Sequence, residues 1–174
     1  MKEITKFKNV STKEANIDFA LFLNEIKNGR YKEQVSSLRT LLKEKDTDEY
    51  GKQKKNLPGV TIAGTIGDKR NNKGIDEYSG LIHLDYDYIE NVEELRKKIE
   101  EIPFTYASFI SPSGNGLKVV IRTDAKMDEH QHYFNAIKKL YDKSVGLGSD
   151  GMVKDLARLC FVSYDPNLYF NESS

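Results

Sequence analysis

From residue 80 onward, the expected elements follow the order strand, helix, strand, strand, helix, strand (βαββαβ). This order predicts an α+β fold with a ferredoxin-like, RRM-like palm. Two apolar runs on either side of a Ser-Pro-Ser-Gly-Asn-Gly turn indicate paired strands, and segments with helical periodicity flank this pair. The 174 residues fit a single domain. We divide it into an amino-terminal module, residues 1–79, and a palm, residues 80–174.

The amino-terminal module is expected to contain two helices followed by one strand. The sequence Ser-Thr-Lys-Glu at residues 11–14 is a capping-box pattern, and it precedes an apolar helical series that ends at Gly29. The other expected segments are a helix over 32–45, a polar stretch over 46–56, a strand over 57–66 and a flexible loop over 67–74.

The palm elements follow from hydrophobic period and from helix caps. An apolar strand is predicted over 80–88. Asn91 is an expected N-cap with Glu94 at the third helical position, and the helix should end near Glu101, ahead of Pro103. The remaining predictions are strands over 105–110 and 117–122, a long helix over 128–144, a loop over 146–151 and a last strand over 159–163.

Composition restricts the class of protein. Lys and Arg total 27 and Asp and Glu total 27, so only local clusters of cations can indicate a nucleic-acid partner. Cys160 is the only cysteine, which excludes an internal disulfide and a cysteine-rich zinc cluster. We find neither an apolar signal region nor a run long enough to cross a bilayer. These features predict a cytoplasmic protein without a membrane partner.

Asp85 and Asp87 are the first candidate site residues, within the run Leu-Ile-His-Leu-Asp-Tyr-Asp-Tyr at residues 81–88. Side chains two apart on a strand point to the same face. Two carboxylates this close repel each other unless a cation lies between them, and Mg²⁺ takes such oxygen ligands. A buried strand avoids unpaired acids, which favours a metal site over a polar turn. His83 shares this face and is expected to be a hydrogen-bonded structural residue.

The turn over 111–118 is the second candidate. Its glycines permit close backbone approach and an anion-binding nest, and its hydroxyl and ammonium groups suit a triphosphate. The spacing does not match a Walker A loop, and a plain hairpin turn is the alternative interpretation. Because the first and third strands of such a palm are neighbours, Lys118 is expected beside Asp85. The candidate nucleotide-binding residues in this turn are Ser111, Ser113, Gly114, Asn115, Gly116 and Lys118.

A third acidic ligand and several cations complete the candidate site. Asp150 and Asp155 compete for the third metal position, and Asp155 has a structural alternative as a cap or ion-pair partner. Arg158 is expected either to contact phosphate or to pair with Asp155. Lysine clusters are solvated surface in most proteins, but the candidates for contacting DNA phosphates are Lys52, Lys54, Lys55, Lys69, Arg70 and Lys73.

These motifs, in this order, resemble the archaeo-eukaryotic primase superfamily of primase-polymerases. More narrowly, four segments resemble its VirE N-terminal-like branch, which is found in bacterial mobile elements and phages and is often fused to a helicase. The segments are Leu-Pro-Gly-Val-Thr-Ile-Ala-Gly at 57–64, Gly-Leu-Ile-His-Leu-Asp-Tyr-Asp at 80–87, Ser-Pro-Ser-Gly-Asn-Gly-Leu-Lys at 111–118 and Ala-Arg-Leu-Cys-Phe-Val-Ser-Tyr-Asp-Pro at 157–166.

The resemblance implies a DNA primase-polymerase that transfers nucleotides from nucleoside triphosphates to a primer on a single-stranded DNA template. It implies Mg²⁺ or Mn²⁺ as cofactor, replication of a mobile element or phage as context, and a fused or associated helicase as partner. Asp85 and Asp87 match the family's metal-binding pair, and Asp150 matches the third acid, with Asp155 in reserve. Lys118 stands where many relatives have histidine.

Two other functions stay open at this point. A catalytically silent relative that binds nucleotide or DNA would account for Lys118, because lysine neutralises phosphate but is a poor proton shuttle near neutral pH. A metal-dependent nuclease is the other alternative, since two-metal carboxylate sites also cut DNA.

Overall fold

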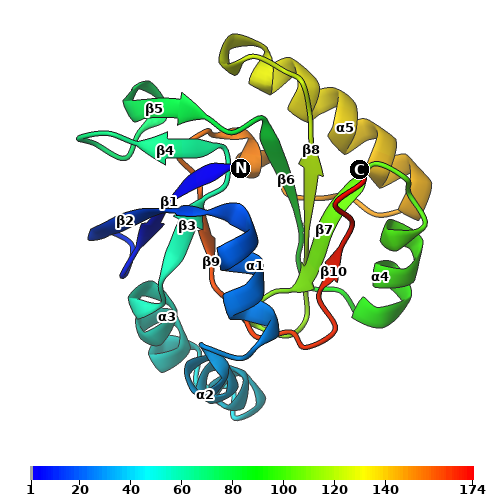
Figure 1. Ribbon diagram of the computed structural model, residues 1–174. Coiled ribbons are helices and arrows are strands. Elements are labelled where there is room, and N and C mark those ends of the chain that lie inside the picture. The colour runs from blue at the N-terminus through cyan, green and yellow to red at the C-terminus, as the bar shows by residue number, and fades with distance from the viewer. Residues whose placement is uncertain (1) are drawn as a thin grey trace.

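The computed structural model describes residues 2–174, and it has the predicted α+β class. The described chain forms two four-stranded antiparallel sheets, a two-stranded hairpin and five α-helices (Figure 1). No helix within residues 2–174 is long and apolar enough to cross a membrane.

The first sheet joins strands of the amino-terminal part of the chain to β9, which comes late in the sequence. Its order is β2-β1-β3-β9, and every neighbouring pair is antiparallel. The hairpin of β4 and β5 extends from the turn that follows β3 (Figure 1). The bounds are β1 Glu3–Phe7, β2 Lys13–Asp18, β3 Gly59–Thr61, β4 Gly64–Ile66, β5 Ile75–Tyr78 and β9 Leu159–Phe161.

The second sheet has the order β10-β7-β8-β6, again antiparallel throughout. Its first, third and second palm strands (β6, β8 and β7) are therefore arranged as a βαββαβ unit requires. The strand expected over 159–163 was predicted to be the fourth strand of this sheet. That prediction is wrong, because the strand found there, β9, pairs with β3 in the first sheet. The bounds are β6 Leu81–Tyr86, β7 Thr105–Ile110, β8 Leu117–Arg122 and β10 Tyr169–Phe170.

The helices cover the sheets in three groups. Helix α1 (Phe19–Lys27) lies between the two sheets, and α2 (Lys32–Lys43) and α3 (Thr47–Asn56) follow it at one end (Figure 1). Helices α4 (Val92–Glu100) and α5 (His130–Val145) cover the outer face of the second sheet. Asn91 caps α4 as predicted, since its side chain accepts a hydrogen bond from the Glu94 amide.

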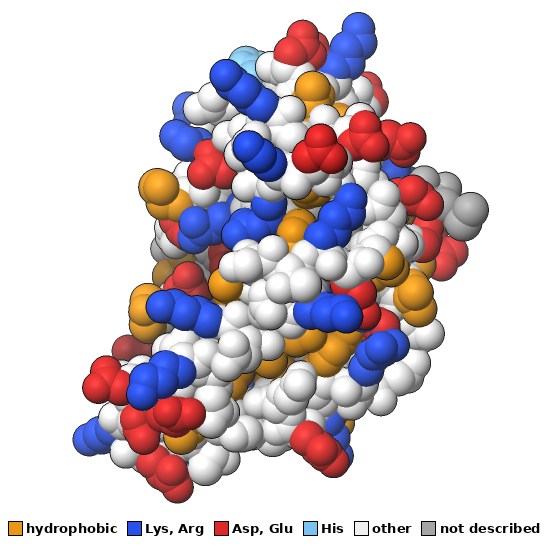
Figure 2. All heavy atoms as spheres, turned by 90° about the vertical axis from the view of Figure 1, so that its left-hand side faces the viewer, with side chains coloured by type: hydrophobic (Ala, Val, Ile, Leu, Met, Phe, Trp, Pro, Cys, Tyr) orange, Lys and Arg blue, Asp and Glu red, His pale blue; other side chains and the backbone are white. Residues whose placement is uncertain are grey.

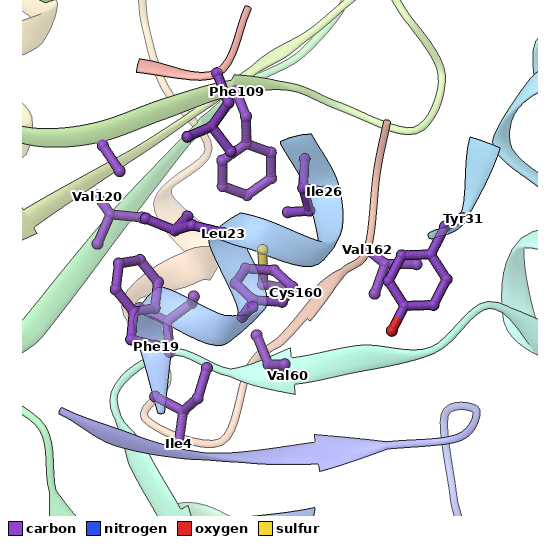
Figure 3. Packing of buried hydrophobic residues seen from close by; sticks show 14 of the residues in the cluster. Ile4, Phe19, Leu23, Ile26, Tyr31, Val60, Phe109, Val120, Cys160 and Val162 are labelled. Carbon is purple, nitrogen blue, oxygen red and sulfur yellow. The ribbon is translucent and has the colours of Figure 1, made fainter. Parts of the chain in front are cut away.

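Two apolar clusters result from the alternation of side chains along β6 and β8. One face packs with α1 and the first sheet, as Figure 3 shows for Phe19, Val60, Phe109 and Val120. The opposite face packs beneath α4 and α5, through Ile82 and other fully buried residues. Because the first cluster draws on both ends of the chain, the predicted amino-terminal module and palm share one core.

Several predictions in the amino-terminal module are wrong. Residues 13–18 form strand β2 instead of a helix, because they pair with β1. Asp18 caps α1, accepting from the Ala20 amide at 2.8 Å, and the 11–14 pattern caps no helix in the described structure. The expected polar stretch over 46–56 contains α3, and the expected strand over 57–66 is divided into β3 and β4.

The bounds predicted for the elements of residues 80–145 agree closely with the structure. Strands β7 and β8 have the predicted bounds, and α4 and α5 lie within two residues of theirs. Figure 2 shows the face on the left of Figure 1, where positive and negative side chains are interspersed. The described surface on that side is therefore not uniformly basic, which agrees with the balanced composition.

Candidate functional site

A cleft of about 270 Å³ opens between the ends of the two sheets, and we call it the acid–cation cleft. It brings together residues that lie far apart in the sequence, from the amino-terminal module, from β6 and β8, and from the segment before β9. The lining residues are Val10, Lys54, Arg70, Asp85, Asp87, Ser111, Pro112, Ser113, Lys118, Asp150, Arg158, Leu159 and Phe161.

Asp85 and Lys118 form the floor of this cleft. They are direct partners across the antiparallel pair of β6 and β8, and the Lys118 ammonium donates to Asp85 Oδ2. Only 16% of the Asp85 side chain and 8% of the Lys118 side chain are exposed. Burial disfavours both charges, but the pairing outweighs it, so the pKa of Asp85 is lowered and that of Lys118 is raised. The predicted neighbourhood of these two residues is confirmed.

The second oxygen of Asp85 distinguishes this pair from a purely structural one. Oδ1 is buried and has no hydrogen-bond partner among residues 2–174. An ionised carboxylate has lone pairs on both oxygens, and leaving one buried oxygen unpaired costs free energy. The floor of the cleft therefore holds an acceptor that a donor or a cation would satisfy.

Asp87 and Asp150 place two further carboxylates at the same cleft. Asp87 follows β6 and most of its surface is exposed. The part of its carboxyl group that is shielded from water, together with the neighbouring Asp85, raises its pKa. The backbone amide of Asp150 donates to the Asp85 carbonyl at 2.8 Å, which fixes the loop beside β6. Asp150 Oδ1 caps the short turn after it, and Oδ2 lies 3.7 Å from Arg158 Nη2. Asp150 and Asp155 were the two candidates for the third acidic metal ligand. Asp150 lines the cleft, and Asp155 does not.

The turn at 111–116 joins β7 and β8 as a hairpin, the plainer of the two interpretations given above. The Gly114 amide donates to the Ser111 carbonyl at 3.0 Å, so this amide is used within the turn. The Ser111 and Ser113 hydroxyls lie 2.8 Å apart, and both residues line the cleft. A Cβ at Gly116 would lie 2.6 Å from the Tyr86 carbonyl oxygen, so this close approach requires glycine.

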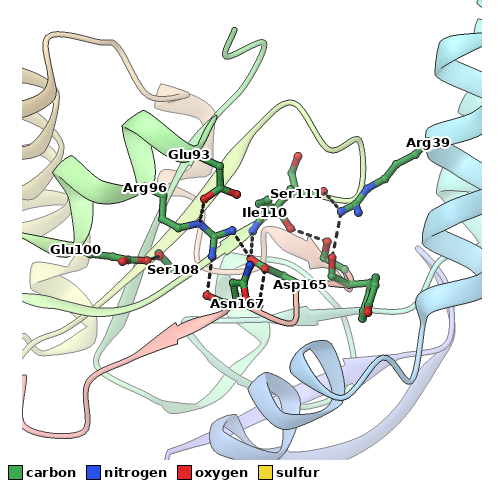
Figure 4. A network of polar contacts seen from close by, with 11 residues as sticks. Arg39, Glu93, Arg96, Glu100, Ser108, Ile110, Ser111, Asp165 and Asn167 are labelled. Atoms are coloured by element: carbon green, nitrogen blue, oxygen red, sulfur yellow. Dashed lines mark hydrogen bonds and ion pairs between the residues drawn. The ribbon is translucent and has the colours of Figure 1, made fainter. Parts of the chain in front are cut away.

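Arg39 of α2 holds the same turn from behind, and the sequence did not single it out. Its guanidinium donates to the carbonyls of Ser111, Pro112 and Tyr164 at 3.2 to 3.3 Å (Figure 4). Such contacts cannot be predicted from the sequence, because an arginine on an amphipathic helix is expected to be a solvated surface residue.

Asp165 is the second support that the sequence did not reveal. It is 2% exposed, and its Oδ2 accepts from Arg96 Nη2 at 2.7 Å and from the Ile110 amide at 2.8 Å (Figure 4). Its Oδ1 accepts from the Asn167 amide at 3.1 Å. These contacts tie α4 and the chain after β9 to the end of β7, directly before the turn at 111–116.

The predicted DNA-binding cations separate into two groups. Lys54 and Arg70 line the cleft, and Lys54 Nζ lies over the ring of Phe161 at 5.9 Å. Arg70 is engaged by the protein, because it donates to the carbonyls of Val10 and Ala157 at 2.9 and 3.0 Å. The four predicted cations that do not line the cleft are Lys52, Lys55, Lys69 and Lys73.

His83 and Cys160 lie behind the cleft floor and are buried. Burial, with a contribution from Lys118, lowers the pKa of His83 to about 3, so its imidazole is neutral. Burial raises the pKa of Cys160 to about 11, which keeps the thiol protonated. Neither residue is poised as an acid, a base or a nucleophile near neutral pH.

The donor set of the cleft suits a hard divalent cation. Mg²⁺ and Mn²⁺ take carboxylate oxygens, and Asp85 offers a buried oxygen that lacks a partner. Asp87 and Asp150 are the further donors at the same cleft. Across residues 2–174, no three His, Cys, Asp or Glu side chains already stand in a metal-holding group, so binding would require these carboxylates to turn inward.

Comparison with protein families gives a match over most of the chain. Residues 52–170 match the family described as the BT4734-like, N-terminal domain. The chain belongs to this family. The matched segment includes all the carboxylates of the cleft, the turn at 111–116 and the strands of the second sheet, whereas Arg39 lies outside it. Neither the curated proteins nor the solved structures gave a match to this chain.

Proposed function

We propose that this chain is a metal-dependent nucleotidyltransferase of the primase-polymerase kind, with a primase-like palm formed by the second sheet and its two outer helices. It would form phosphodiester bonds from nucleoside triphosphates on a single-stranded DNA template. The observation that carries this proposal is the acid–cation cleft, where three carboxylates meet a buried lysine and hydroxyl groups.

The cleft supplies the two kinds of group that such a reaction requires. Carboxylates on β6 and on the neighbouring loop are suited to hold Mg²⁺ or Mn²⁺, which would supply electrostatic stabilisation of the attacking and leaving oxygens. Asp85, Asp87 and Asp150 are the ligands that we assign. All three line the cleft, and the hydrogen bond from the Asp150 amide to the Asp85 carbonyl holds the loop of Asp150 beside β6.

The cations and hydroxyl groups that line the same cleft are suited to bind a triphosphate. Arg158 is 46% exposed and is placed to form paired contacts with phosphate oxygens. Lys54 and the hydroxyls of Ser111 and Ser113 add further donors. Arg39 would act as a positioning residue, because it donates to backbone carbonyls of the turn at 111–116, which we call the serine turn. The proposal includes replication of a mobile element or phage, with a helicase as partner.

A second function is supported by the ion pair on the floor. Lys118 already neutralises Asp85, and a lysine held in this way cannot accept a proton near neutral pH. A silent relative that binds nucleotide or DNA without catalysis would keep such a pair. A nuclease would use the same carboxylates.

Primer synthesis separates these functions. Labelled nucleotides are supplied on a single-stranded DNA template with Mg²⁺ or Mn²⁺, and the unmodified chain is compared with the Asp85→Ala/Asp87→Ala double variant. We expect product from the unmodified chain and at least a hundredfold less from the variant, as on removing a major electrostatic contribution. Asp128→Ala, at an exposed acid in the short turn Met127–Glu129 that precedes α5, is the matched control.

Each other result points to a different function. Equal synthesis by the double variant would overturn the assignment of the carboxylates. DNA binding without product, with either metal, would favour the silent relative. Shortening of the template without incorporation would indicate a nuclease.

A further inference from the structure

A second hollow lies immediately beside the acid–cation cleft, and we call it the Tyr88 recess. Its volume is about 340 Å³. It is formed by the segment that leads from β6 into α4, by α4 itself and by the end of α5. Residues that matter to the argument are Tyr88, Asn91, Leu95, Lys98, Val145 and Leu147.

Tyr88 is the unusual residue of this recess. Its side chain is 88% exposed, the highest value among the large hydrophobic residues of the described chain. Its backbone is left-handed, with φ of +57°, a conformation that costs free energy for any residue with a Cβ. The fold thus holds a large aromatic ring in solvent on a strained backbone, and such strain occurs most often at functional sites.

A contact to the serine turn fixes this conformation. The amide of Ile89, the next residue, donates to the Asn115 carbonyl at 2.8 Å. The turn that borders the acid–cation cleft therefore also holds the chain around Tyr88. Asp87 lines the cleft and Tyr88 lines the recess, so adjacent residues, whose Cα atoms are about 3.8 Å apart, belong to the two hollows.

The recess has the chemistry of a site for a flat ring. Leu95 and Val145 are buried and give it an apolar base, and Leu147 is 42% exposed at its edge. Asn91 and Lys98 add polar groups at the margin. Aromatic side chains bind nucleobases by stacking on them, which tolerates any base because each presents a π-face.

We propose that the Tyr88 recess is a nucleobase subsite, in which the Tyr88 ring stacks on a base whose phosphate lies toward the acid–cation cleft. The inference rests on the proposed function and extends it, because it assigns a place to the base where that proposal concerned phosphate and metal. The base belongs either to a nucleoside triphosphate or to a single strand, and the experiment separates these two sources.

The chain contains no tryptophan, so a single introduced indole reports on one position only. In the Tyr88→Trp variant, a stacked base should quench the fluorescence. Phe104→Trp is the matched control, because Phe104 is also an exposed aromatic, at 60%, and it precedes β7 at the end remote from the serine turn. Titrations use a nucleoside triphosphate, a single-stranded oligonucleotide and an oligonucleotide of the same length without bases.

We expect quenching of the Tyr88→Trp variant by the nucleotide or by the oligonucleotide with bases, and not by the abasic strand. Whichever of the first two ligands quenches identifies the source of the base. The Phe104→Trp control should keep its fluorescence with all three ligands. Binding measured by anisotropy without any quenching would overturn the subsite and leave the proposed function standing. Absence of all binding to the unmodified chain would overturn both.

The Tyr88→Gly variant tests the proposal in a chain that should remain folded. Glycine adopts a left-handed backbone without steric cost, so this variant should be at least as stable as the unmodified chain. We expect its affinity for the quenching ligand to fall roughly tenfold, which is the effect of losing one aromatic stack. Tyr88→Phe keeps the ring and should bind normally. Unchanged affinity in Tyr88→Gly would overturn the proposal.

Discussion

Asp165, which is buried, and Asp85, which is partly buried, each pair with a cation, yet their surroundings differ. Asp165 accepts three hydrogen bonds, distributed over both oxygens, and lies between α4 and the end of β7. Asp85 has its only side-chain partner, Lys118, on one oxygen, and its other oxygen has no partner in residues 2–174. A fully satisfied carboxylate stabilises a fold, whereas a partly satisfied one beside a cleft retains the capacity to bind a ligand.

The largest expected effect comes from Asp165→Asn. An amide has a single acceptor oxygen, so it cannot serve the donors that converge on both oxygens of Asp165, and Arg96 would lose its buried counter-charge. We expect the free energy of unfolding to fall by about 3 to 5 kcal/mol. Urea denaturation measures it, with Asp128→Asn as the exposed control. A loss below about 1 kcal/mol would contradict the structural role of Asp165.

Asp85→Asn should have a smaller effect on stability. The amide oxygen still accepts from Lys118, and Asp87 remains as a second acid that favours the Lys118 ammonium when the charge of Asp85 is removed. We expect a loss of about 1 to 2 kcal/mol in the same denaturation experiment, together with loss of primer synthesis. If Asp85→Asn proved as destabilising as Asp165→Asn, the distinction between the two carboxylates would be wrong.

Asp87→Asn should change stability least, by less than about 0.5 kcal/mol, and still abolish primer synthesis. The pKa of Asp87 is raised by partial burial and by Asp85, so the folded chain binds its proton more tightly than the unfolded chain does. Its contribution to stability therefore falls as the pH rises from the ordinary pKa of 3.8 through the raised pKa. In Asp87→Asn, this fall in the free energy of unfolding with rising pH should be absent.

Asp85 gives the opposite pH dependence, which makes the comparison sharper. Its pKa is lowered, so its stabilisation is complete above the ordinary value of 3.8 and is lost as the pH falls through the folded pKa. Urea midpoints recorded between about pH 3 and 6 should show less acid lability in Asp85→Asn than in the unmodified chain. Parallel curves for the two variants would contradict these assigned pKa directions.

The sequence predicted the palm better than the amino-terminal module, for physical reasons. The palm strands and α4 have strong apolar periods and a clear cap at Asn91, so local and tertiary preferences agree there. Strand β2 is mostly exposed, and its pairing with β1 supplies what its pattern lacks. Helix α3 has no buried residue among those described in it, so it offered no apolar stripe to detect.

The candidate site was predicted to the same uneven degree. Asp85, Asp87 and Lys118 could be found because alternation along a strand fixes which side chains share a face. Asp150 was placed by motif order, and the structure brings it to the cleft through a backbone contact that leaves no trace in the sequence. Arg39 and Asp165 act on backbone carbonyls and amides, which have no residue-specific signature.

The pairing of β9 with β3 has a consequence for synthesis of the chain on the ribosome. Strands β1 to β3 are synthesised early, but β3 cannot pair with β9 until about a hundred further residues have been added. Gly59, for example, pairs with Phe161. Closing so long a loop is slow, and until then β3 presents an unpaired edge. Asp150 and Arg158 emerge in that same late segment. A nascent chain therefore carries Asp85, Asp87 and Lys118 before Asp150 and Arg158 have been added, and the lining of the cleft is complete only after this late segment has emerged.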